Sequence, residues 1–375
     1  MAIFYLENEN FTDAEKLVVS HGDIRVYTFR YSTGTAGLKI ENKRGYFTVL
    51  PFYGHQIWRA SFDGIDLHMD TNLAEPTELE QFLDSYGCFV MHSGLCGVGG
   101  PGPEDSHKPH GDLPVAAFRH PRIECGEDEG GRYVRVLATF HKYRTYSDNY
   151  KFTSGYKLYE NGAVITSSVK IENLRKRPME YVYLCHINFM PFEGAKLIGT
   201  LPLDKEHIEV LKVIPASMPE EEAKKLSDYM DKMQENPEVH VVVDKKSQMY
   251  DPEIVAKLTY LADEEGYAHT LQKRTDGYAC YVKHPVEPLN NSLRWISRTD
   301  DEEAMGMVLP ASAINKGYTY AKKNGMVRTI EGESTLEFSM DFGLLVPAET
   351  EEMCKKIEKV LAKCWVQSTI KFYIA

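Results

Sequence analysis

Alternating apolar and polar positions recur along most of the chain and predict β-strands. The first expected strands are DIRVYTFRY (23–31), GLKIEN (37–42) and YFTVLP (46–51). QIWRASFDGIDL (56–67) divides at Asp63-Gly64 into two strands and a turn. Five further segments have strand patterning: RYVRVLATFHKY (132–143), EYVYLCHINF (180–189), GYACYVKHP (277–285), SLRWISRT (292–299) and STLEFSMDFGLLVP (334–347). KLYENGAVITSSVKIEN (157–173) is the clearest hairpin, and its Asn161-Gly162 pair predicts a type I′ turn.

Two segments have helical periodicity instead. SMPEEEAKKLSDYMDKMQ predicts a helix with Ser217 as N-cap, Pro219 in the first turn and Glu220 completing a capping box. Its apolar positions form one stripe: Ala223, Leu226, Met230 and Met233. A second helix is expected to be capped by Thr350. Its inward positions are Met353, Ile357, Val360, Leu361 and Cys364.

The repeated strand-turn-strand spacing favours a mainly β fold of antiparallel sheets over alternating strand-helix units. We expect one β-rich domain over residues 23–347, with a helical insertion near 217–235 and a C-terminal helix and tail over 348–375. Residues 1–22 read as a helical or irregular lead-in, because Thr12 and Glu15 have capping-box spacing. Gln81 to Ala117 is rich in Gly and Pro and predicts a long irregular segment.

The composition and charge of the chain limit the classes of partner that it can bind. The chain has 375 residues, 43% of them hydrophobic, and a net charge of −12 with no block of Lys or Arg. A neutral small molecule fits this field better than nucleic acid or an anionic membrane does. The seven cysteines show no Cys-x-x-Cys spacing, and no signal peptide or long apolar run is evident, so a cytoplasmic protein with reduced thiols is expected. The oligomeric state stays open.

Known motifs exclude several chemistries. The chain has no Gly-x-Gly-x-x-Gly after a strand, no P-loop, no His-Glu-x-x-His and no Gly-x-Ser-x-Gly. GVGGPGPED (97–105) is glycine-rich but leads into prolines, so a tight loop is favoured over a phosphate cradle.

The histidines carry the remaining chemistry. In HKPHGDLP (107–114), Pro109 and Pro114 exclude a regular helix, and Gly111 permits positive φ or a close backbone approach. His107 and His110 are therefore expected in an irregular connection, and two exposed histidines in a turn are the plain alternative. His92 and His120 lie in the same region, and His186 precedes Asn188 near a strand end. Such a set suits general acid–base catalysis, or a metal held with Asp112 or Glu104, while each histidine alone can be a hydrogen-bonded structural residue.

These segments resemble those of aldose 1-epimerases (galactose mutarotases). HKPHGDLP is similar to the His-Gly loop of that family, CHINF (185–189) to its second histidine motif, and SSVKIEN (167–173) to the strand before it. The resemblance covers most of residues 35–345 and is closest to a poorly characterised bacterial branch. It implies a galactose-mutarotase-like β-supersandwich with a sugar site on a concave face.

The resemblance also implies roles for residues. In the family one histidine protonates the ring oxygen of a cyclic aldose, and a glutamate removes the anomeric hydroxyl proton. By motif position His186 is the acid, and His110 binds or polarises the sugar oxygens. Asp112 would orient His110 or bind a hydroxyl, and His107 lies at the rim. Asn188, His92, Gln56 and Arg59 complete the expected substrate-binding set.

One departure puts the base in doubt. Where the related branch has Gly-x-Glu-Pro, this chain reads GMVLPAS, so Leu309 stands in place of the glutamate. The substitutes considered are Glu287, Asp251, Glu253 or a histidine acting alone.

Three functions follow, each with a small-molecule sugar as partner. The first is an epimerase-like enzyme with a relocated base and no cofactor. The second is a metal-assisted isomerase or lyase that uses His107, His110 and His186 with a divalent ion. The third is a carbohydrate-binding protein without catalysis. Which sugar binds is not determined by the sequence.

Overall fold

The strands form two large antiparallel sheets and one small one in the computed structural model, which describes the backbone of residues 1–374 and the side chains of residues 1–363. The first sheet has the order β1-β9-β10-β11-β12-β22-β18-β17-β14. Its strands are β1 (Ala2–Tyr5), β9 (Arg119–Asp128), β10 (Gly131–Arg144), β11 (Asp148–Tyr159), β12 (Val164–Asn173), β14 (Lys196–Gly199), β17 (Tyr267–Lys273), β18 (Ala279–Pro285) and β22 (Thr335–Leu345).

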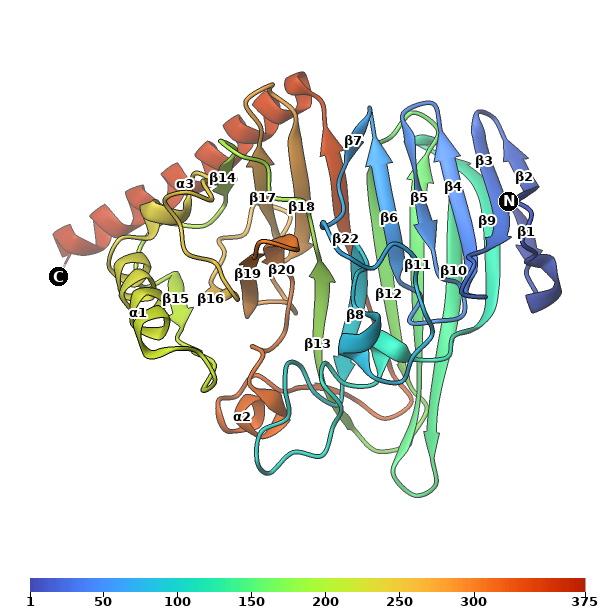
Figure 1. Ribbon diagram of the computed structural model, residues 1–375, viewed down its shortest axis with the longest axis horizontal. Helices are drawn as coiled ribbons and strands as arrows, with labels where there is room; N and C mark the ends of the chain where they lie inside the picture. Colours follow the sequence, from blue (N-terminus) through green and yellow to red (C-terminus); the bar gives the residue numbers. More distant parts are fainter. Residues whose placement is uncertain (375) are drawn as a thin grey trace.

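The second large sheet has the order β2-β3-β4-β5-β6-β8-β13-β21, with β7 paired to β6. Its strands are β2 (Lys16–His21), β3 (Ile24–Arg30), β4 (Ala36–Asn42), β5 (Gly45–Val49), β6 (Ile57–Phe62), β7 (Ile65–Asp66), β8 (Val90–Leu95), β13 (Met179–Ile187) and β21 (Arg328–Ile330). Figure 1 shows this sheet in front of the first. Apolar side chains of both sheets, such as Phe47 and Phe152, are fully buried in one cluster between them. This burial explains the alternation along the strands.

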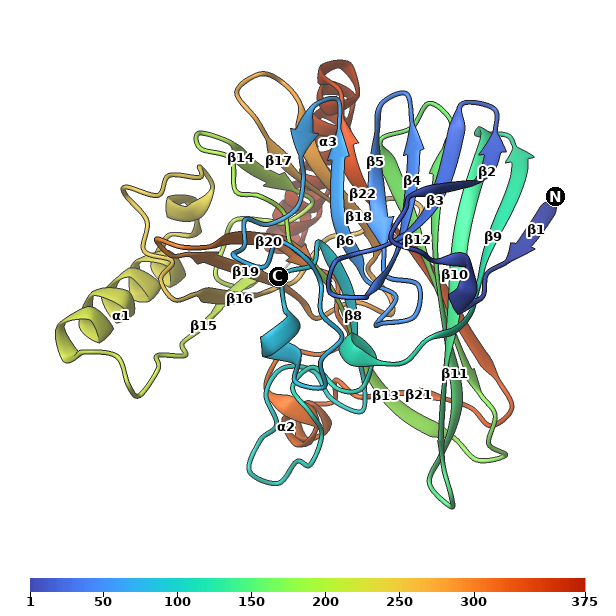
Figure 2. The same ribbon diagram turned by 45° about the vertical axis from the view of Figure 1, so that its right-hand side comes forward.

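The small sheet, β15-β16-β19-β20, lies beside the large pair, and the helix α1 lies beyond it (Figure 2). Its strands are β15 (Ile208–Leu211), β16 (Ile254–Leu258), β19 (Ser292–Arg298) and β20 (Glu303–Leu309). The three α-helices of the described residues are α1 (Glu220–Glu235), α2 (Gly317–Lys323) and α3 (Pro347–Ile374). Short 3-10 turns occur at η1 (Asn8–Asn10), η2 (Phe82–Ser85), η3 (Leu113–Val115) and η4 (Pro237–His240). The mainly β, antiparallel fold is thus confirmed.

Several local expectations are wrong. Thr12 does not begin a helix; its hydroxyl donates to the Ala14 carbonyl, and β2 follows. In the β11–β12 hairpin, Gly162 N–H donates to Tyr159 O, so Glu160 and Asn161 are the central residues of the turn. Neither Asn161 nor Gly162 has positive φ, which excludes the type I′ turn.

Both expected helix caps are also misplaced. α1 begins at Glu220 with Pro219 at its N-cap position, and no side chain caps it. α3 begins at Pro347, where a proline costs no hydrogen bond, and Thr350 lies buried inside the helix. The inward position of Cys364 lies outside the residues whose side chains are described.

The segment expected to be irregular contains a central strand, β8, between β6 and β13. All six of its residues are buried, so its sequence VMHSGL lacks the apolar–polar alternation of a strand with one solvent-exposed face. β8 carries His92 and β13 carries His186.

Candidate functional site

His186 lies near the end of β13, and its ring is fixed from one side. Its Nδ1 is 2.5 Å from Oδ1 of Asn188, the next residue on the same face of the strand. Asn188 is fully buried, and its Nδ2 donates to the Cys88 carbonyl at 2.9 Å. Asn188 therefore orients the His186 ring through Nδ1 instead of facing a substrate.

Tyr86 closes the same side of the site. It follows η2, and its hydroxyl donates to Asn188 Oδ1 at 3.0 Å. Its ring centroid lies 5.7 Å from that of His186 at a steep angle. Burial raises the pKa of Tyr86 well above its ordinary value, with a smaller contribution from Cys88. Tyr86 is therefore a neutral hydrogen-bond donor.

His110 stands opposite His186, with ring centroids 5.6 Å apart. It has positive φ (59°), and its backbone is held by hydrogen bonds to Gly94 and Gly99. Gly111 follows with φ of 80°, and a Cβ there would lie 2.4 Å from the Gly94 carbonyl oxygen. The expected irregular connection and the requirement for glycine are confirmed.

Aromatic side chains surround the two imidazoles. The Phe82 ring lies 5.1 Å from that of His110, and the Trp295 ring 5.1 Å from that of His186. Trp295 comes from β19 of the small sheet, and its Nε1 donates to Glu253 Oε2 at 2.5 Å. The site is thus built where the second large sheet, the small sheet and the two loops meet.

Both histidines are neutral at physiological pH. Burial lowers the pKa of His186 to about 3 and that of His110 to about 4. A nearby histidine lowers each further, and Asn188 offsets part of the effect at His186. A neutral imidazole has one donor and one acceptor nitrogen, so its tautomer determines what it offers a ligand.

His92 does not join this group. It pairs with Cys185 across β8 and β13, so it faces the side of the sheet opposite to His186. Its ring is fully buried, with Nδ1 2.7 Å from the Tyr183 hydroxyl and Nε2 2.8 Å from the Ser154 hydroxyl. The substrate-binding role expected for His92 is wrong; it is a core residue.

His107 and Asp112 also differ from expectation. The His107 ring lies beneath Gly97, where a Cβ would approach it to 2.4 Å, and its Nε2 is 3.6 Å from Asp105. Asp105 in turn accepts from the Thr319 N–H in α2. Asp105 therefore holds the glycine-rich loop against α2. Asp112 does not orient His110; its carboxylate lies 3.1 Å from Lys142 Nζ.

Gln56 and Arg59 serve the backbone of the loops. Gln56 is buried and donates to the Pro114 carbonyl at 2.8 Å. The Arg59 guanidinium donates to the carbonyls of Gly87 at 2.8 Å and Leu73 at 2.7 Å. Arg59 therefore anchors the segment that carries Tyr86, and neither side chain contacts the two imidazoles.

Of the substitutes considered for the base, only Glu253 joins the site, through Trp295. Leu309 is buried in an apolar cluster with Val182 and Leu184. Glu287 pairs with Arg328, and Asp251 is exposed. Glu104 pairs with Lys323.

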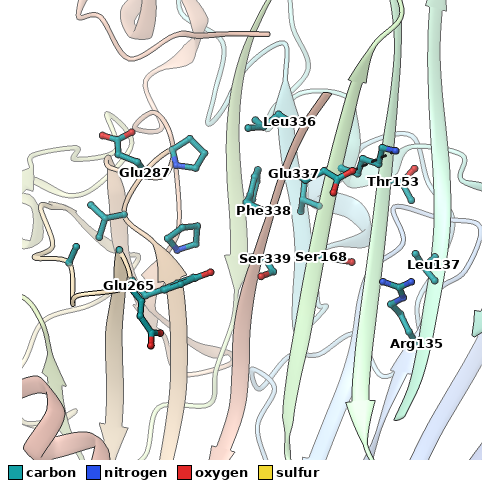
Figure 3. A pocket seen from close by; sticks show the side chains of 18 of the residues that line it. Arg135, Leu137, Thr153, Ser168, Glu265, Glu287, Leu336, Glu337, Phe338 and Ser339 are labelled. Carbon is teal, nitrogen blue, oxygen red and sulfur yellow. Dashed lines mark ion pairs between the residues drawn. The ribbon is translucent and has the colours of Figure 1, made fainter. Parts of the chain in front are cut away.

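Among the described residues, the histidines form no metal-ligand cluster and do not line the large surface hollow. No group of three or more His, Cys, Asp or Glu side chains there has metal-site geometry, so His107, His110 and His186 do not form the expected metal triad. A hollow of about 990 Å³ lies on the face of the first sheet opposite to the core (Figure 3). Its lining, which includes Ser168 and Ser339, contains none of the histidine-site residues. No helix of the described residues combines the length and apolarity needed to cross a membrane.

The family model for the DUF4432 domain, a domain of unknown function, matches residues 32–344. The chain belongs to the DUF4432 family. No curated protein matches this DUF4432 chain.

Several solved structures also match the chain. A Klebsiella pneumoniae protein described as a "putative aldose 1-epimerase" is 15% identical, with a TM-score of 0.77 and 96% of each chain covered. Galactose mutarotase-like proteins from Clostridium acetobutylicum (10% identity, TM-score 0.54, 87% of this chain and 100% of the other) and Lactobacillus casei (13%, 0.52, 82% and 100%) also match. At these identities the comparisons establish the galactose-mutarotase-like fold of the DUF4432 chain, which the sequence motifs had indicated.

Sequence reasoning missed three aromatic members of this DUF4432 site. Phe82 and Tyr86 lie in a segment without periodicity, and Trp295 alternates in a strand like any core aromatic. Only the tertiary structure brings them to the histidines.

Proposed function

We propose that the chain is an aldose 1-epimerase-like isomerase that acts at the anomeric centre of a sugar, with His186 and His110 as its acid–base groups. The observation that carries this proposal is the pair of neutral imidazoles, 5.6 Å apart between ring centroids. Mutarotation moves one proton off the anomeric hydroxyl and another onto the ring oxygen, which two such groups can serve.

The surroundings favour a neutral sugar. Phe82, Tyr86 and Trp295 offer aromatic surface that packs against the apolar faces of a pyranose. The charged side chain that joins the group is Glu253, whose negative charge disfavours sugar phosphates and uronates. The chain's net charge of −12 acts in the same direction.

Glu253 supports the chemistry without replacing the family glutamate directly. It accepts the Trp295 N–H, so it fixes the indole against His186. We expect its charge to stabilise an imidazolium that forms at His186 during turnover. If the histidine pair moves the proton itself, the reaction needs no base at the family position, which Leu309 occupies.

Saturation-transfer NMR of anomer exchange, measured over a panel of neutral aldoses, tests the proposal. Exchange above the uncatalysed rate is expected for at least one aldose, and it should be lost in His186→Ala but kept in His141→Ala, a surface control. Saturable sugar binding without exchange would instead identify a binding protein. The same preparation is analysed for metal: activity that depends on a stoichiometric divalent ion would favour the metal-assisted alternative.

A further inference from the structure

The orientation of the Asn188 amide is determined by its neighbours. Cys88 presents a carbonyl, which can only accept, so the Asn188 atom beside it must be the Nδ2 donor. Oδ1 then points to Tyr86 and His186. The reverse orientation would bring two oxygens together at Cys88.

This amide selects one tautomer of His186. Asn188 Oδ1 is an acceptor, so the nitrogen 2.5 Å from it, Nδ1, must carry the proton. In the neutral ring Nε2 then carries no proton and offers a lone pair. Nε2 has no hydrogen-bond partner among the described residues, yet it is not one of the polar atoms sealed from solvent, and the residue is 6% exposed. Nε2 is therefore the ring nitrogen that remains for a ligand.

His110 has the opposite arrangement. Its Nδ1 is sealed from solvent and has no partner among the described residues, whereas Nε2 is not sealed. A buried N–H without an acceptor is rarer in proteins than an acceptor without a donor. The proton therefore belongs on Nε2, which gives the site a donor opposite the acceptor of His186.

We infer that Asn188 is a positioning residue that holds His186 as the proton acceptor of the site, with His110 as the facing hydrogen-bond donor. The tautomers follow from the geometry alone, and their catalytic meaning rests on the proposed function. The inference reverses the role that the family resemblance implies for His186, which is the acid.

The proton balance closes with His186 as a relay. Nε2 takes the anomeric hydroxyl proton, and the O–H pair becomes the C1=O1 bond. The C1–O5 pair moves to the ring oxygen, which His110 Nε2–H holds by a hydrogen bond. The imidazolium then returns the same proton to O5, giving the open-chain aldehyde and neutral His186. Both oxygens are attached to C1, so one nitrogen can serve them in turn.

Long-range ¹H–¹⁵N NMR of the full chain labelled at histidine tests the tautomers without reference to activity. We expect a protonated Nδ1 and an unprotonated Nε2 for His186, and the reverse for His110. The two spin systems are identified by their loss in His186→Gln and His110→Gln. A protonated Nε2 on His186 at neutral pH would overturn the inference, even if anomer exchange is found; absence of exchange with the expected tautomers would refute only the proposed function.

Asn188→Asp adds a kinetic readout. A carboxylate accepting from Nδ1 favours the imidazolium, so the acidic limb of the kcat/KM profile should move to higher pH. The titratable groups beside the ring are His110 and Tyr86, and Cys88 and Glu253 act on Tyr86; none of the four is altered. Asn161→Asp in the exposed β11–β12 turn is the matched control. An unmoved limb would contradict the positioning role, and if the variant does not fold, the wild-type tautomers still decide.

Discussion

Trp295 donates its indole N–H to Glu253 at 2.5 Å, and the same ring packs 5.1 Å from His186. Trp295 lies in β19 and Glu253 directly precedes β16, so the bond holds the indole at the small sheet, and the packing of the indole links that sheet to the imidazole on the large one. It also gives the site a carboxylate that is not at the family position, since Leu309 there is buried among apolar side chains.

Glu253→Gln should lower kcat/KM for anomer exchange by roughly 10-fold or more, because the charge that stabilises the His186 imidazolium is lost. The amide can still accept the indole N–H, so the fold and sugar binding should change little. Trp295→Phe keeps an aromatic ring but removes the N–H, so it separates placement from charge. Full activity in Glu253→Gln, measured by saturation transfer, would leave Glu253 as a structural residue only.

His186→Ala should reduce exchange by roughly 10²–10⁴-fold, the range for one acid–base group. It should also destabilise the chain by about 1–3 kcal/mol, because buried Asn188 loses a donor. Urea denaturation gives the second number. His107→Ala is the informative comparison: its ring packs under Gly97, so stability should fall while a folded variant keeps exchange. Loss of exchange in a fully folded His107→Ala would place that histidine in the site.

Much of the fold could be predicted because one face of most strands packs on the core. β8 could not, since a strand buried on both faces has no alternation, and helix starts such as Pro347 depended on local contacts that outweigh capping motifs.

Only part of the site could be predicted from the sequence. His110 and His186 stand in recognisable motifs, whereas His92 looked equally suitable until the β8–β13 register placed it on the opposite face. Tyr86 and Trp295 are more than 200 residues apart in sequence, with ring centroids 6.2 Å apart, and no local pattern marks that contact.

Acid should destabilise the chain steeply. Burial lowers the pKa of His92, His186, His240 and His284 to about 3 each, below the unfolded value of about 6.5. Between these values the unfolded chain binds more protons, so stability rises with pH; the contribution is complete above about pH 6.5 and is lost as pH falls toward 3. Near pH 5 unfolding should take up about four protons from these groups. Urea denaturation at successive pH values measures this, and a slope near zero between pH 4 and 6 would contradict the burial of these rings.

Arg59→Ala should disturb the site from outside it. The guanidinium donates to the carbonyls of Gly87, Leu73 and Trp58, and it stacks 4.5 Å from the Trp58 ring centroid. Its removal leaves these acceptors without their donor, at an expected cost of about 1–3 kcal/mol in the free energy of unfolding.

Tyr86 directly precedes Gly87, so the same change should also lower kcat/KM by loosening the hydroxyl that bonds Asn188. Arg59→Lys should give an intermediate loss, because one ammonium cannot reproduce the planar fork. Arg119→Ala, at an exposed position of β9, is the matched control. If Arg59→Ala loses stability but keeps full exchange in the folded protein, the segment that carries Tyr86 is held by other contacts, and Arg59 has no part in positioning the site.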